Sequence, residues 1–286
     1  MSCVLRSLTA ALIIGIGLSA MPPASAQPSP GSKTRSDTVD FSPTGTVEIY
    51  NHTGSITVAT WDRAQVGYEM TLAPSDSDSV VAVPPAVHRS DRELSFGHDS
   101  GWSLNIPGLL TISTGGPDEP VGHFRIVMPE TAALEVGDHA STIEVSDVQG
   151  AVDLDTHQGT ARVHDVDGPL TVDTHAGSAE ATGLRKGATL DTHEGRITAS
   201  FDDVTAPISV DTHSGTVRLF LPPDAGFELQ LDLDEEDLTV DEAFGTPTSS
   251  GDEHRAFNGS GPPIELDSFS GTVEVRPLKA KASPSP

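Results

Sequence analysis

The chain has almost no cysteine and little lysine. Its single cysteine, Cys3, lies within the N-terminal segment that we interpret below as a cleaved leader. The mature protein is therefore predicted to contain neither a disulfide nor a reactive thiol. Lysine occurs only four times against 42 acidic residues, and the formal net charge is −26. Such a surface repels phosphate backbones and anionic lipid, so we expect no nucleic-acid partner.

This acidic, lysine-poor composition has two explanations. A salt-rich habitat is one, because a dense layer of carboxylates stays hydrated there and salt screens its self-repulsion. An ordinary acidic extracellular protein is the other. The amino-acid composition alone fits both hypotheses equally.

The sequence also lacks the common motifs of catalytic and cofactor-binding sites. It contains no Gly-x-Ser-x-Gly, no His-Glu-x-x-His and no phosphate-binding loop. We therefore assign no catalytic residue, no cofactor and no metal site, and we expect that the protein is not an enzyme. A polysaccharide-active β-helix enzyme is the remote alternative, since solenoids of strands do support polysaccharide cleavage.

Long apolar runs are confined to the first residues. Arg6 is followed by an apolar run from Leu8 to Ala20, and small residues around Ala26 precede Gln27. This order is typical of a secretory signal peptide, and the run is shorter than a membrane-spanning helix requires. We predict export to the periplasm, the cell surface or the extracellular space, with no membrane insertion after cleavage.

A five-residue word, Asp-Thr-His-x-Gly, recurs between residues 155 and 215. Successive copies begin 18, 18 and 20 residues apart. A nearly fixed period of this length is typical of stacked repeat proteins, in which each unit buries its apolar face only against its neighbours. The four copies are Asp155 to Gly159, Asp173 to Gly177, Asp191 to Gly195 and Asp211 to Gly215.

Apolar and polar residues alternate on both sides of each copy. Leu170 and Val172 precede the threonine of the second copy, and Ala179 and Ala181 follow its glycine. A period of two indicates a β-strand with one face turned inward. Each unit is therefore predicted to be a strand, a turn that contains the glycine, and a second strand. We expect the glycine to supply the positive φ that tight turns often require.

These units predict an all-β protein with the fold of a β-solenoid, a β-helix-like repeat stack. Equivalent residues of successive coils would then lie about 4.8 Å apart, the distance between neighbouring strands. The alternative is an antiparallel β-roll or sandwich, in which the word is a hairpin loop instead of a coil corner. Units of nearly equal length gain most from stacking in register, which favours the solenoid.

Composition and weaker copies of the pattern divide the rest of the chain. His52 and His139 lie in weaker copies ahead of the array. In the last unit Phe269 stands where the word has histidine, and we expect this atypical unit to cap the stack. The sequence does not decide whether the N-terminal region belongs to the same body. The predicted segments are a signal peptide (1–26), a disordered leader (27–37), an N-terminal β region (38–130), the β-repeat array with its capping unit (131–276) and a disordered tail (277–286).

These features resemble a bacterial family of exported β-strand-repeat proteins, the "putative adhesin" family, which contains a domain of unknown function. The resemblance rests on the early unit Asn51 to Ile56, the strand and proline at Val127 to Pro129, the repeated word and the closing segment Ser270 to Val275. It implies a solenoid-like β fold outside the cytoplasm, and it supplies no catalytic residues to carry over. The regular histidine of the word departs from the family pattern.

Stacking would arrange the aspartates and histidines of the word in outward columns. The simplest interpretation is structural, because Asp and Thr near a turn accept backbone N–H groups and imidazoles reduce repulsion between carboxylates. The sharper hypothesis is metal binding, since imidazole and carboxylate are good ligands for zinc and similar ions. Its candidate ligands are Asp155, His157, Asp173, His175, Asp191, His193, Asp211 and His213.

The sequence therefore predicts a non-catalytic binding or structural module at the cell envelope. A long, rigid and regular surface suits an extended glycan, or an envelope or surface protein, as the partner. A metal-binding envelope protein that uses the Asp and His columns is the alternative function.

Overall fold

The computed structural model describes residues 31–74, 85–89, 93–98, 120–250, 253–259 and 261–278. The predicted signal peptide and residues 279–286 of the predicted tail lie outside these ranges. Within them the regular elements are β-strands and two short 3-10 turns, η1 (Glu235–Asp237) and η2 (Glu242–Phe244). No helix in these ranges is long and apolar enough to cross a membrane. The predicted all-β class is confirmed.

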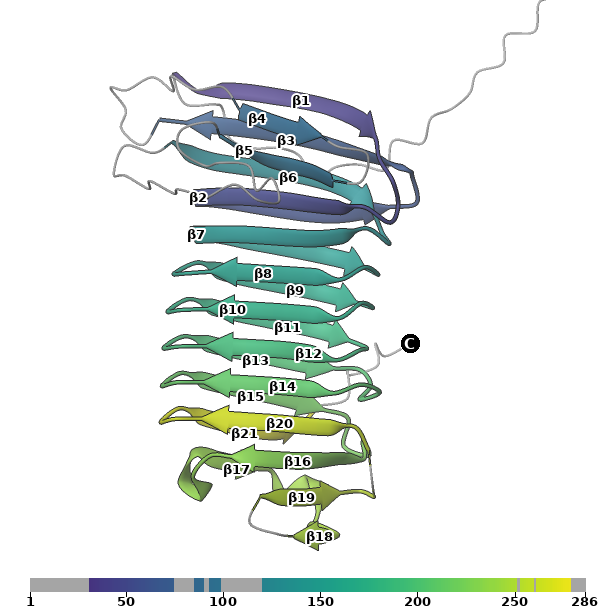
Figure 1. Cartoon of the computed structure of the whole chain (residues 1–286), viewed down its shortest axis with the longest axis vertical. Coiled ribbons are helices and arrows are strands. Elements are labelled where there is room, and N and C mark those ends of the chain that lie inside the picture. Colours follow the sequence, from purple (N-terminus) through teal and green to yellow (C-terminus); the bar gives the residue numbers. More distant parts are fainter. Residues whose placement is uncertain are drawn as a thin grey trace, which may run out of the picture.

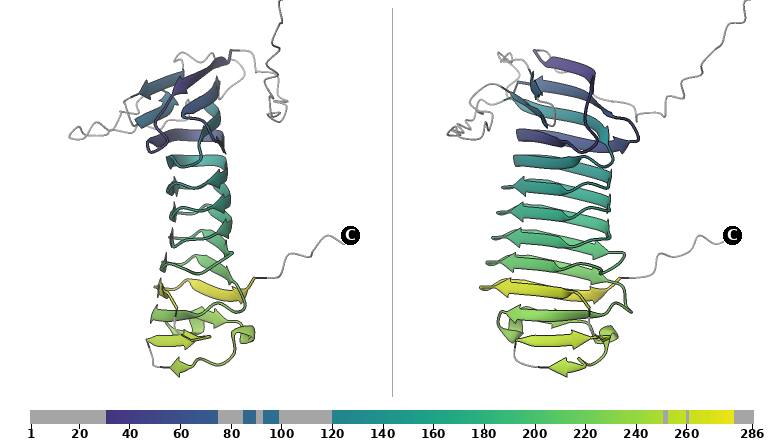
Figure 2. Two further views of the ribbon diagram at one scale, coloured as in Figure 1. Left: turned by 90° about the vertical axis from the view of Figure 1, so that its right-hand side faces the viewer. Right: turned by 45° about the vertical axis from the view of Figure 1, so that its right-hand side comes forward.

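The repeats form a tower of stacked rungs (Figure 1). Each rung is a strand, a corner and a second strand that returns on the opposite side, so two sheets face each other across the core (Figure 2). Sheet A contains the first strand of each rung and sheet B the second. The central rungs are β8 (Val152–Thr156) with β9 (Thr160–Val166), β10 (Leu170–Thr174) with β11 (Ser178–Leu184), β12 (Ala188–Thr192) with β13 (Arg196–Phe201), and β14 (Ile208–Thr212) with β15 (Thr216–Leu221).

Successive rungs pair in parallel and in register. In sheet A, Asp173 of β10 pairs with Asp155 of β8 and with Asp191 of β12. In sheet B the strands β9, β11, β13 and β15 pair in the same parallel manner. Hairpins of a roll or sandwich would pair antiparallel. The predicted solenoid is therefore confirmed, and the antiparallel alternative is wrong for the repeat array.

The N-terminal region continues the same stack. Two long strands, β2 (Thr46–Trp61) and β7 (Ala133–Val148), each pass through a corner, and residues 46–58 of β2 pair in parallel with residues 133–145 of β7. Beyond β2, β5 (Glu93–His98) extends sheet A and β6 (Val121–Pro129) extends sheet B. The N-terminal region and the repeat array are thus one body.

Antiparallel strands close the N-terminal end of the tower. β3 (Gln65–Ala73) pairs with β6, β1 (Lys33–Asp40) pairs with β3, and β4 (Pro85–Arg89) pairs with β5. Charged residues on the outermost strand β1 discourage further strand addition at this edge. The sequence assigns residues 33–37 to a disordered leader, and this boundary is wrong because they form the first part of β1.

At the C-terminal end the order of the rungs differs from the order of the chain. β20 (Pro263–Ser268) and β21 (Thr272–Pro277) lie directly on β14 and β15, and β16 (Phe227–Asp232) and β17 (Leu238–Val240) lie beyond them (Figure 1). β19 (His254–Phe257) then pairs antiparallel with β16, and β18 (Ser249–Ser250) with β19. The prediction that the last unit caps the stack is wrong, because β16 to β19 form the cap and the last unit is inserted ahead of them.

Aliphatic side chains fill the space between the two sheets in rows. Leu154, Val172 and Leu190 are register partners in sheet A, and all three are buried. Small residues such as Ala179 and Ala181 of sheet B face them from the other side of the core. Burial of one Leu or Val side chain contributes roughly 1.5–3 kcal/mol. Because each rung is only one strand thick, this burial requires the rungs on either side.

A buried threonine and a glycine hold each corner. Thr174 Oγ1 accepts the N–H of Gly177 at 3.0 Å, and the other three copies of the word make the same bond at 2.9–3.1 Å. A Cβ on Gly177 would lie 2.6 Å from the carbonyl oxygen of Gly159. The prediction that these glycines supply a positive φ is wrong, since none of the four has one. Glycine is required there because successive corners approach closely.

We expect Thr174→Val to lower the free energy of unfolding by about 1–3 kcal/mol, because the buried N–H of Gly177 loses its acceptor while the side-chain volume is unchanged. Thr189→Val is the matched control, since Thr189 lies on the exposed face of the neighbouring strand β12. Urea denaturation of both variants measures the difference. Equal stabilities of the two variants would contradict the role assigned to the threonine.

Candidate functional site

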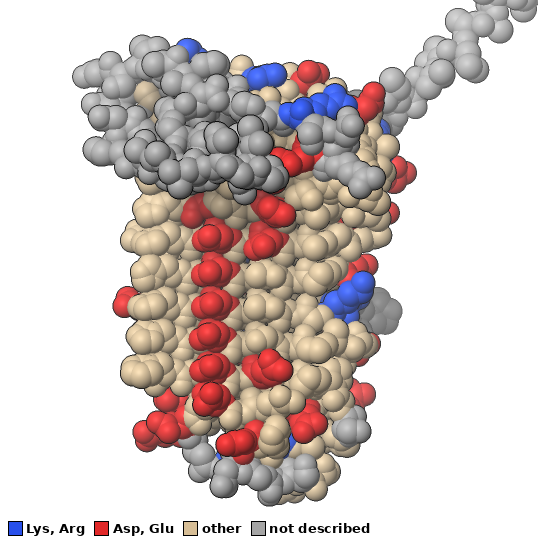
Figure 3. Space-filling view, in the orientation of Figure 1, with Lys and Arg blue, Asp and Glu red and all other residues tan. Residues whose placement is uncertain are grey.

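A line of aspartates runs along the outer face of sheet A, as Figure 3 shows. Register pairing joins each of them to the next across neighbouring strands, so their spacing is that of the strands, about 4.8 Å. Their side chains point outward because buried residues flank them on the strand, as Val172 and Thr174 flank Asp173. We call this line the aspartate column; it consists of Asp155, Asp173, Asp191, Asp211, Asp267 and Asp232.

Crowding raises the pKa of carboxyl groups in the aspartate column. Partial burial raises the pKa of Asp155, and the charges of Asp173 and Asp153 raise it further. The pKa of Asp191 is raised by burial and then by its two column neighbours. At the far end, burial and two neighbouring carboxylates likewise raise the pKa of Asp267. Burial first, and like charges at one strand spacing second, thus oppose the ionised form of these three carboxyl groups.

A second line, the histidine column, lies at the corners beside the aspartates. Neighbouring ring centroids are 4.6–4.8 Å apart. Phe269 continues the line at 4.9 Å from His213 and is 77% exposed. The histidine column consists of His52, His139, His157, His175, His193 and His213.

Backbone hydrogen bonds across the corners set the spacing of the rings. The N–H of His175 donates to the carbonyl oxygen of Thr156 at 3.2 Å, and the N–H of His193 donates to that of Thr174 at 3.1 Å. The corner therefore keeps the spacing of the strands on either side. The ring of His175 is turned by 86° from both of its neighbours, whereas the rings of the terminal pairs lie closer to parallel.

The two columns are electrostatically coupled. His157 lowers the pKa of Asp155, and His193 lowers that of Asp191, although burial and the neighbouring carboxylates have the larger effect in the opposite direction. One nitrogen of the line, His157 Nδ1, is shielded from water and has no hydrogen-bond partner. An imidazole that is protonated thus offsets part of the repulsion within the aspartate column, as the structural interpretation of the sequence requires.

The structure brings all eight candidate metal ligands of the sequence into these two columns. Across the described part of the chain, however, no group of three or more His, Cys, Asp or Glu side chains is placed to hold a metal ion. A straight column offers each ion ligands from one side only, whereas zinc in structural sites takes four ligands in a tetrahedron. The arrangement suits repeated contacts along a line better than one closed metal centre.

Sequence reasoning missed one member of the aspartate column. Asp232 lies in a charge run that resembles a solvated loop, yet it pairs with Asp267 because β16 stacks on β20. The alternation in Leu229-Gln230-Leu231-Asp232 matches that of Leu170-Thr171-Val172-Asp173 and is the signal that finds it. Asp232 is not part of an Asp-Thr-His-x-Gly word, so the alternation alone is a weak signal for its place in the column.

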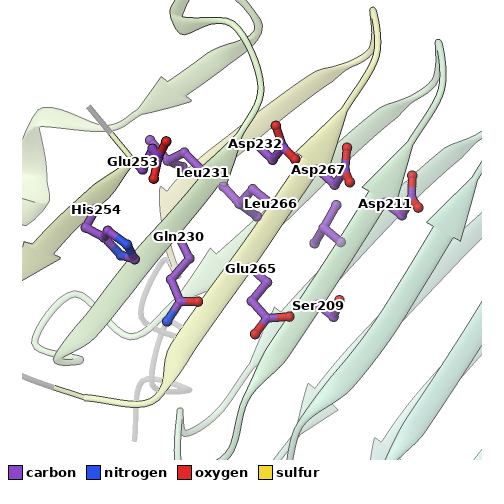
Figure 4. Close-up of a pocket in the computed structure, with 11 residues that line it drawn as sticks. Ser209, Asp211, Gln230, Leu231, Asp232, Glu253, His254, Glu265, Leu266 and Asp267 are labelled. Atoms are coloured by element: carbon purple, nitrogen blue, oxygen red, sulfur yellow. The ribbon is translucent and has the colours of Figure 1, made fainter. Parts of the chain in front are cut away.

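The aspartate column ends in a polar groove of about 360 Å³ on the outer face of β14, β20 and β16. In Figure 4 the carboxylates of Asp211, Asp267 and Asp232 lie in one row, and Glu265 lies in the adjacent row. β19 adds His254, whose Nδ1 lies 3.7 Å from Oε1 of Glu228. Ionised carboxylates only accept hydrogen bonds, so this groove suits hydroxyl groups or cations.

A buried carboxyl group lies on the inner side of the corner within β7. Asp138 is 8% exposed and stands where later rungs have threonine, and its Oδ2 accepts the N–H of Ser141 at 2.7 Å and the hydroxyl of Thr156 at 3.2 Å. Burial raises the pKa of Asp138 despite these bonds. Its Oδ1 and the Oδ1 of its register partner Asn51 have no hydrogen-bond partner. This inner position is structural, because it does not face the outer surface.

Comparison with known proteins adds a family match. A family model described as Toastrack DUF4097 matches residues 129–276, which is just over half of the chain. The match contains the whole aspartate column and every member of the histidine column except His52. No curated protein matches the chain.

Two solved structures are similar to this chain at low identity. A "putative adhesin" from Bacteroides fragilis is 13% identical with a TM-score of 0.41, and the similarity covers 88% of this chain and 100% of that one. A "putative cell adhesion protein" from Clostridium sporogenes is 7% identical with a TM-score of 0.34, covering 86% of this chain and 99% of that one.

The raised pKa values predict that acidification stabilises the fold at first. A carboxyl group with a raised pKa binds its proton more tightly in the folded state, so its stabilising contribution is full below the unfolded pKa of about 4 and is lost as pH rises through the folded pKa. We expect the free energy of unfolding to increase as pH is lowered from 7 toward about 4. Glu274 has the opposite effect on the free energy of unfolding as pH falls, because the hydrogen bond and charge of Arg218 lower its pKa.

Asp173→Asn tests this explanation, because Asp173 raises the pKa of both Asp155 and Asp191. We expect the variant to gain roughly 0.5–1 kcal/mol of stability at pH 7, since two like-charge contacts are removed. The gain should shrink at pH 4 and in molar salt. Asp224→Asn, at an exposed position outside the column, is the control. Loss of stability in Asp173→Asn, or the same gain at every pH and salt concentration, would contradict the prediction.

Proposed function

The chain belongs to the Toastrack DUF4097 family, and from this premise we propose that it is an exported, non-catalytic binding module of the cell envelope. Its partner is an extended polymer that lies along sheet A, a glycan in the first place and an envelope or surface protein in the second. The observation that carries the proposal is the repetition of one aspartate and one histidine on each central rung.

The chemistry of the two columns suits a ligand rich in hydroxyl groups. Ionised carboxylates accept hydrogen bonds, and a neutral imidazole offers one donor and one acceptor. Each rung therefore presents the same small set of partners, about 4.8 Å from the next set. A single contact of this kind is weak in water, but a polymer that engages several rungs at once gains from their high effective concentration.

The rigidity of the stack supports the same function. Backbone hydrogen bonds to the rungs on both sides fix the strands and most of each corner. The outward side chains are therefore held in place before any ligand binds. Binding to such a surface costs little additional ordering of the protein, which favours affinity from modest contacts.

We propose a non-catalytic function because the central rungs repeat the same outward residues. A catalytic site combines a few residues in different roles around one reacting atom. The columns instead repeat one role from rung to rung. Export is proposed from the leader of the sequence, in which Arg6, the apolar run from Leu8 to Ala20 and the small residues before Gln27 form the pattern of a signal peptide.

A glycan array probed with the mature chain from Gln27 tests the proposal. We expect retention on neutral, hydroxyl-rich polysaccharides, with at least a tenfold loss of affinity in the double variant Asp173→Ala/Asp191→Ala. Glu144→Ala/Glu180→Ala is the matched control, because it also removes two exposed carboxylates but from the outer face of sheet B. A reducing-sugar assay on the retained polysaccharides should detect no cleavage.

Three results would contradict this function. Equal loss in both double variants would reduce the effect to overall charge. Release of reducing ends would make the protein an enzyme. Failure to retain any glycan or any protein extracted from the cell envelope would leave the columns without a binding role.

A further inference from the structure

A second groove lies at the N-terminal end of the tower, outside the family match and away from both columns. It has a volume of about 470 Å³ on the outer face of sheet B, where β1, β3, β6 and the end of β2 meet. We propose that this groove binds one ring of a neutral saccharide against the indole of Trp61. The inference rests on the proposed function in one respect, the glycan nature of the partner.

A glycine in the middle of β3 makes the floor of the groove. Register pairing places Gly67 between Thr38 of β1 and Val127 of β6 on the outer face. A Cβ on Gly67 would lie 3.0 Å from Cη2 of Trp61. The missing side chain therefore allows the indole to pack closely over β3. A glycine within a strand often marks such a close approach.

The indole of Trp61 makes one wall and is held in a fixed orientation. Its Nε1 donates to the carbonyl oxygen of Gln65 at 2.7 Å. The guanidinium carbon of Arg63 lies 4.9 Å from the ring centroid, and Arg63 does not line the groove. The cation and the groove therefore contact different parts of the indole. Since its N–H is already bonded, the part of Trp61 that faces the groove is an apolar surface.

Polar groups make the opposite wall at strand spacing. Glu69 of β3 pairs with Ser36 of β1 on one side and with Arg125 of β6 on the other. The wall thus offers a hydroxyl, a carboxylate and a guanidinium in one row. The hydroxyl both donates and accepts, the ionised carboxylate accepts and the guanidinium donates. Such a row matches an edge of alternating hydroxyl groups.

The combination of walls identifies the class of ligand. A pyranose ring has an apolar face of C–H groups and an edge of hydroxyl groups, so its face fits the indole and its edge fits the polar row. An entirely apolar ligand would leave the polar row without partners, at a cost in desolvation. An anionic saccharide is repelled by the net charge of −26. A mostly preformed pocket with an aromatic wall and a few polar groups is the usual form of a small-ligand site.

Tryptophan fluorescence of the mature chain gives the direct test. In a Trp102→Phe background Trp61 is the remaining tryptophan, so changes in emission report on the groove. The probes are cellotetraose, chitotetraose, maltotetraose, tetragalacturonate and tetralysine. We expect a saturable change with at least one neutral tetrasaccharide and none with tetragalacturonate or tetralysine.

Calorimetry with the neutral tetrasaccharide that binds then assigns the residues. Trp61→Ala should weaken binding at least tenfold, and Glu69→Gln, which keeps the size of the side chain, should weaken it several-fold in a protein of unchanged melting temperature. Glu144→Gln is the matched control, because it makes the same change of a carboxylate to an amide at an exposed position of sheet B outside the groove, and it should leave this affinity unchanged.

The inference falls if no neutral tetrasaccharide binds, if only tetragalacturonate or tetralysine binds, or if both Trp61→Ala and Glu69→Gln bind as the parent does. If binding instead disappears in Asp173→Ala/Asp191→Ala and survives in Trp61→Ala, the groove is excluded while the function proposed for the columns stands. Loss in Trp61→Ala and Glu69→Gln but not in the column variant supports the groove.

Discussion

In-register hydrogen bonding between parallel rungs continues into the corners and is interrupted there only at the glycine, whose N–H bonds to the threonine of its own rung. The strands of sheet A pair residue by residue, and the pairing does not stop where the strands end. At the corner the N–H of Ala176 donates to the carbonyl oxygen of His157 at 2.8 Å, and the next rung repeats the bond. As a result, each side chain of a central rung has its own equivalent above and below it, one strand spacing away.

A residue is suited to such a stack when it tolerates its own copy as a neighbour. Aliphatic residues inside the stack pack in rows, and a threonine at the corner bonds the glycine of its own rung. Imidazoles contact one another ring to ring. Carboxylates repel, and partial burial followed by the charges of neighbouring carboxylates raises the pKa of Asp155, Asp191 and Asp267. Since the aspartate column opposes folding at neutral pH, its presence on every central rung is best explained by a role at the surface.

The sequence predicts the repeat array well because the structure there is periodic. A word that returns every 18 or 20 residues determines the length of a rung, and alternation within it determines which side chains face inward. Both columns follow from those two facts once parallel stacking is assumed. The close approach of successive corners, which explains Gly177, is invisible in one rung alone because the clashing atom belongs to the next.

What the sequence does not predict depends on contacts between distant segments. The insertion of β20 between β14 and β16 changes the order of the rungs, and it makes Asp232 a neighbour of Asp267. The pairing of residues 33–37 with β3 is likewise non-local. Trp61, Gly67 and Arg125 line the N-terminal groove together because β3 pairs antiparallel with β6. No periodic pattern in the sequence predicts that pairing.

Disulfide trapping measures the register of the stacked corners, because the mature chain is predicted to have no cysteine of its own. Two residues can be bridged when their Cα atoms lie about 4.4–6.8 Å apart, which one strand spacing satisfies and two do not. In-register stacking predicts that His175→Cys/His193→Cys and His213→Cys/Phe269→Cys oxidise readily in the folded protein, whereas His175→Cys/His213→Cys does not. Ready oxidation of the last pair, or resistance of the first two, would contradict the in-register stack and the rung order.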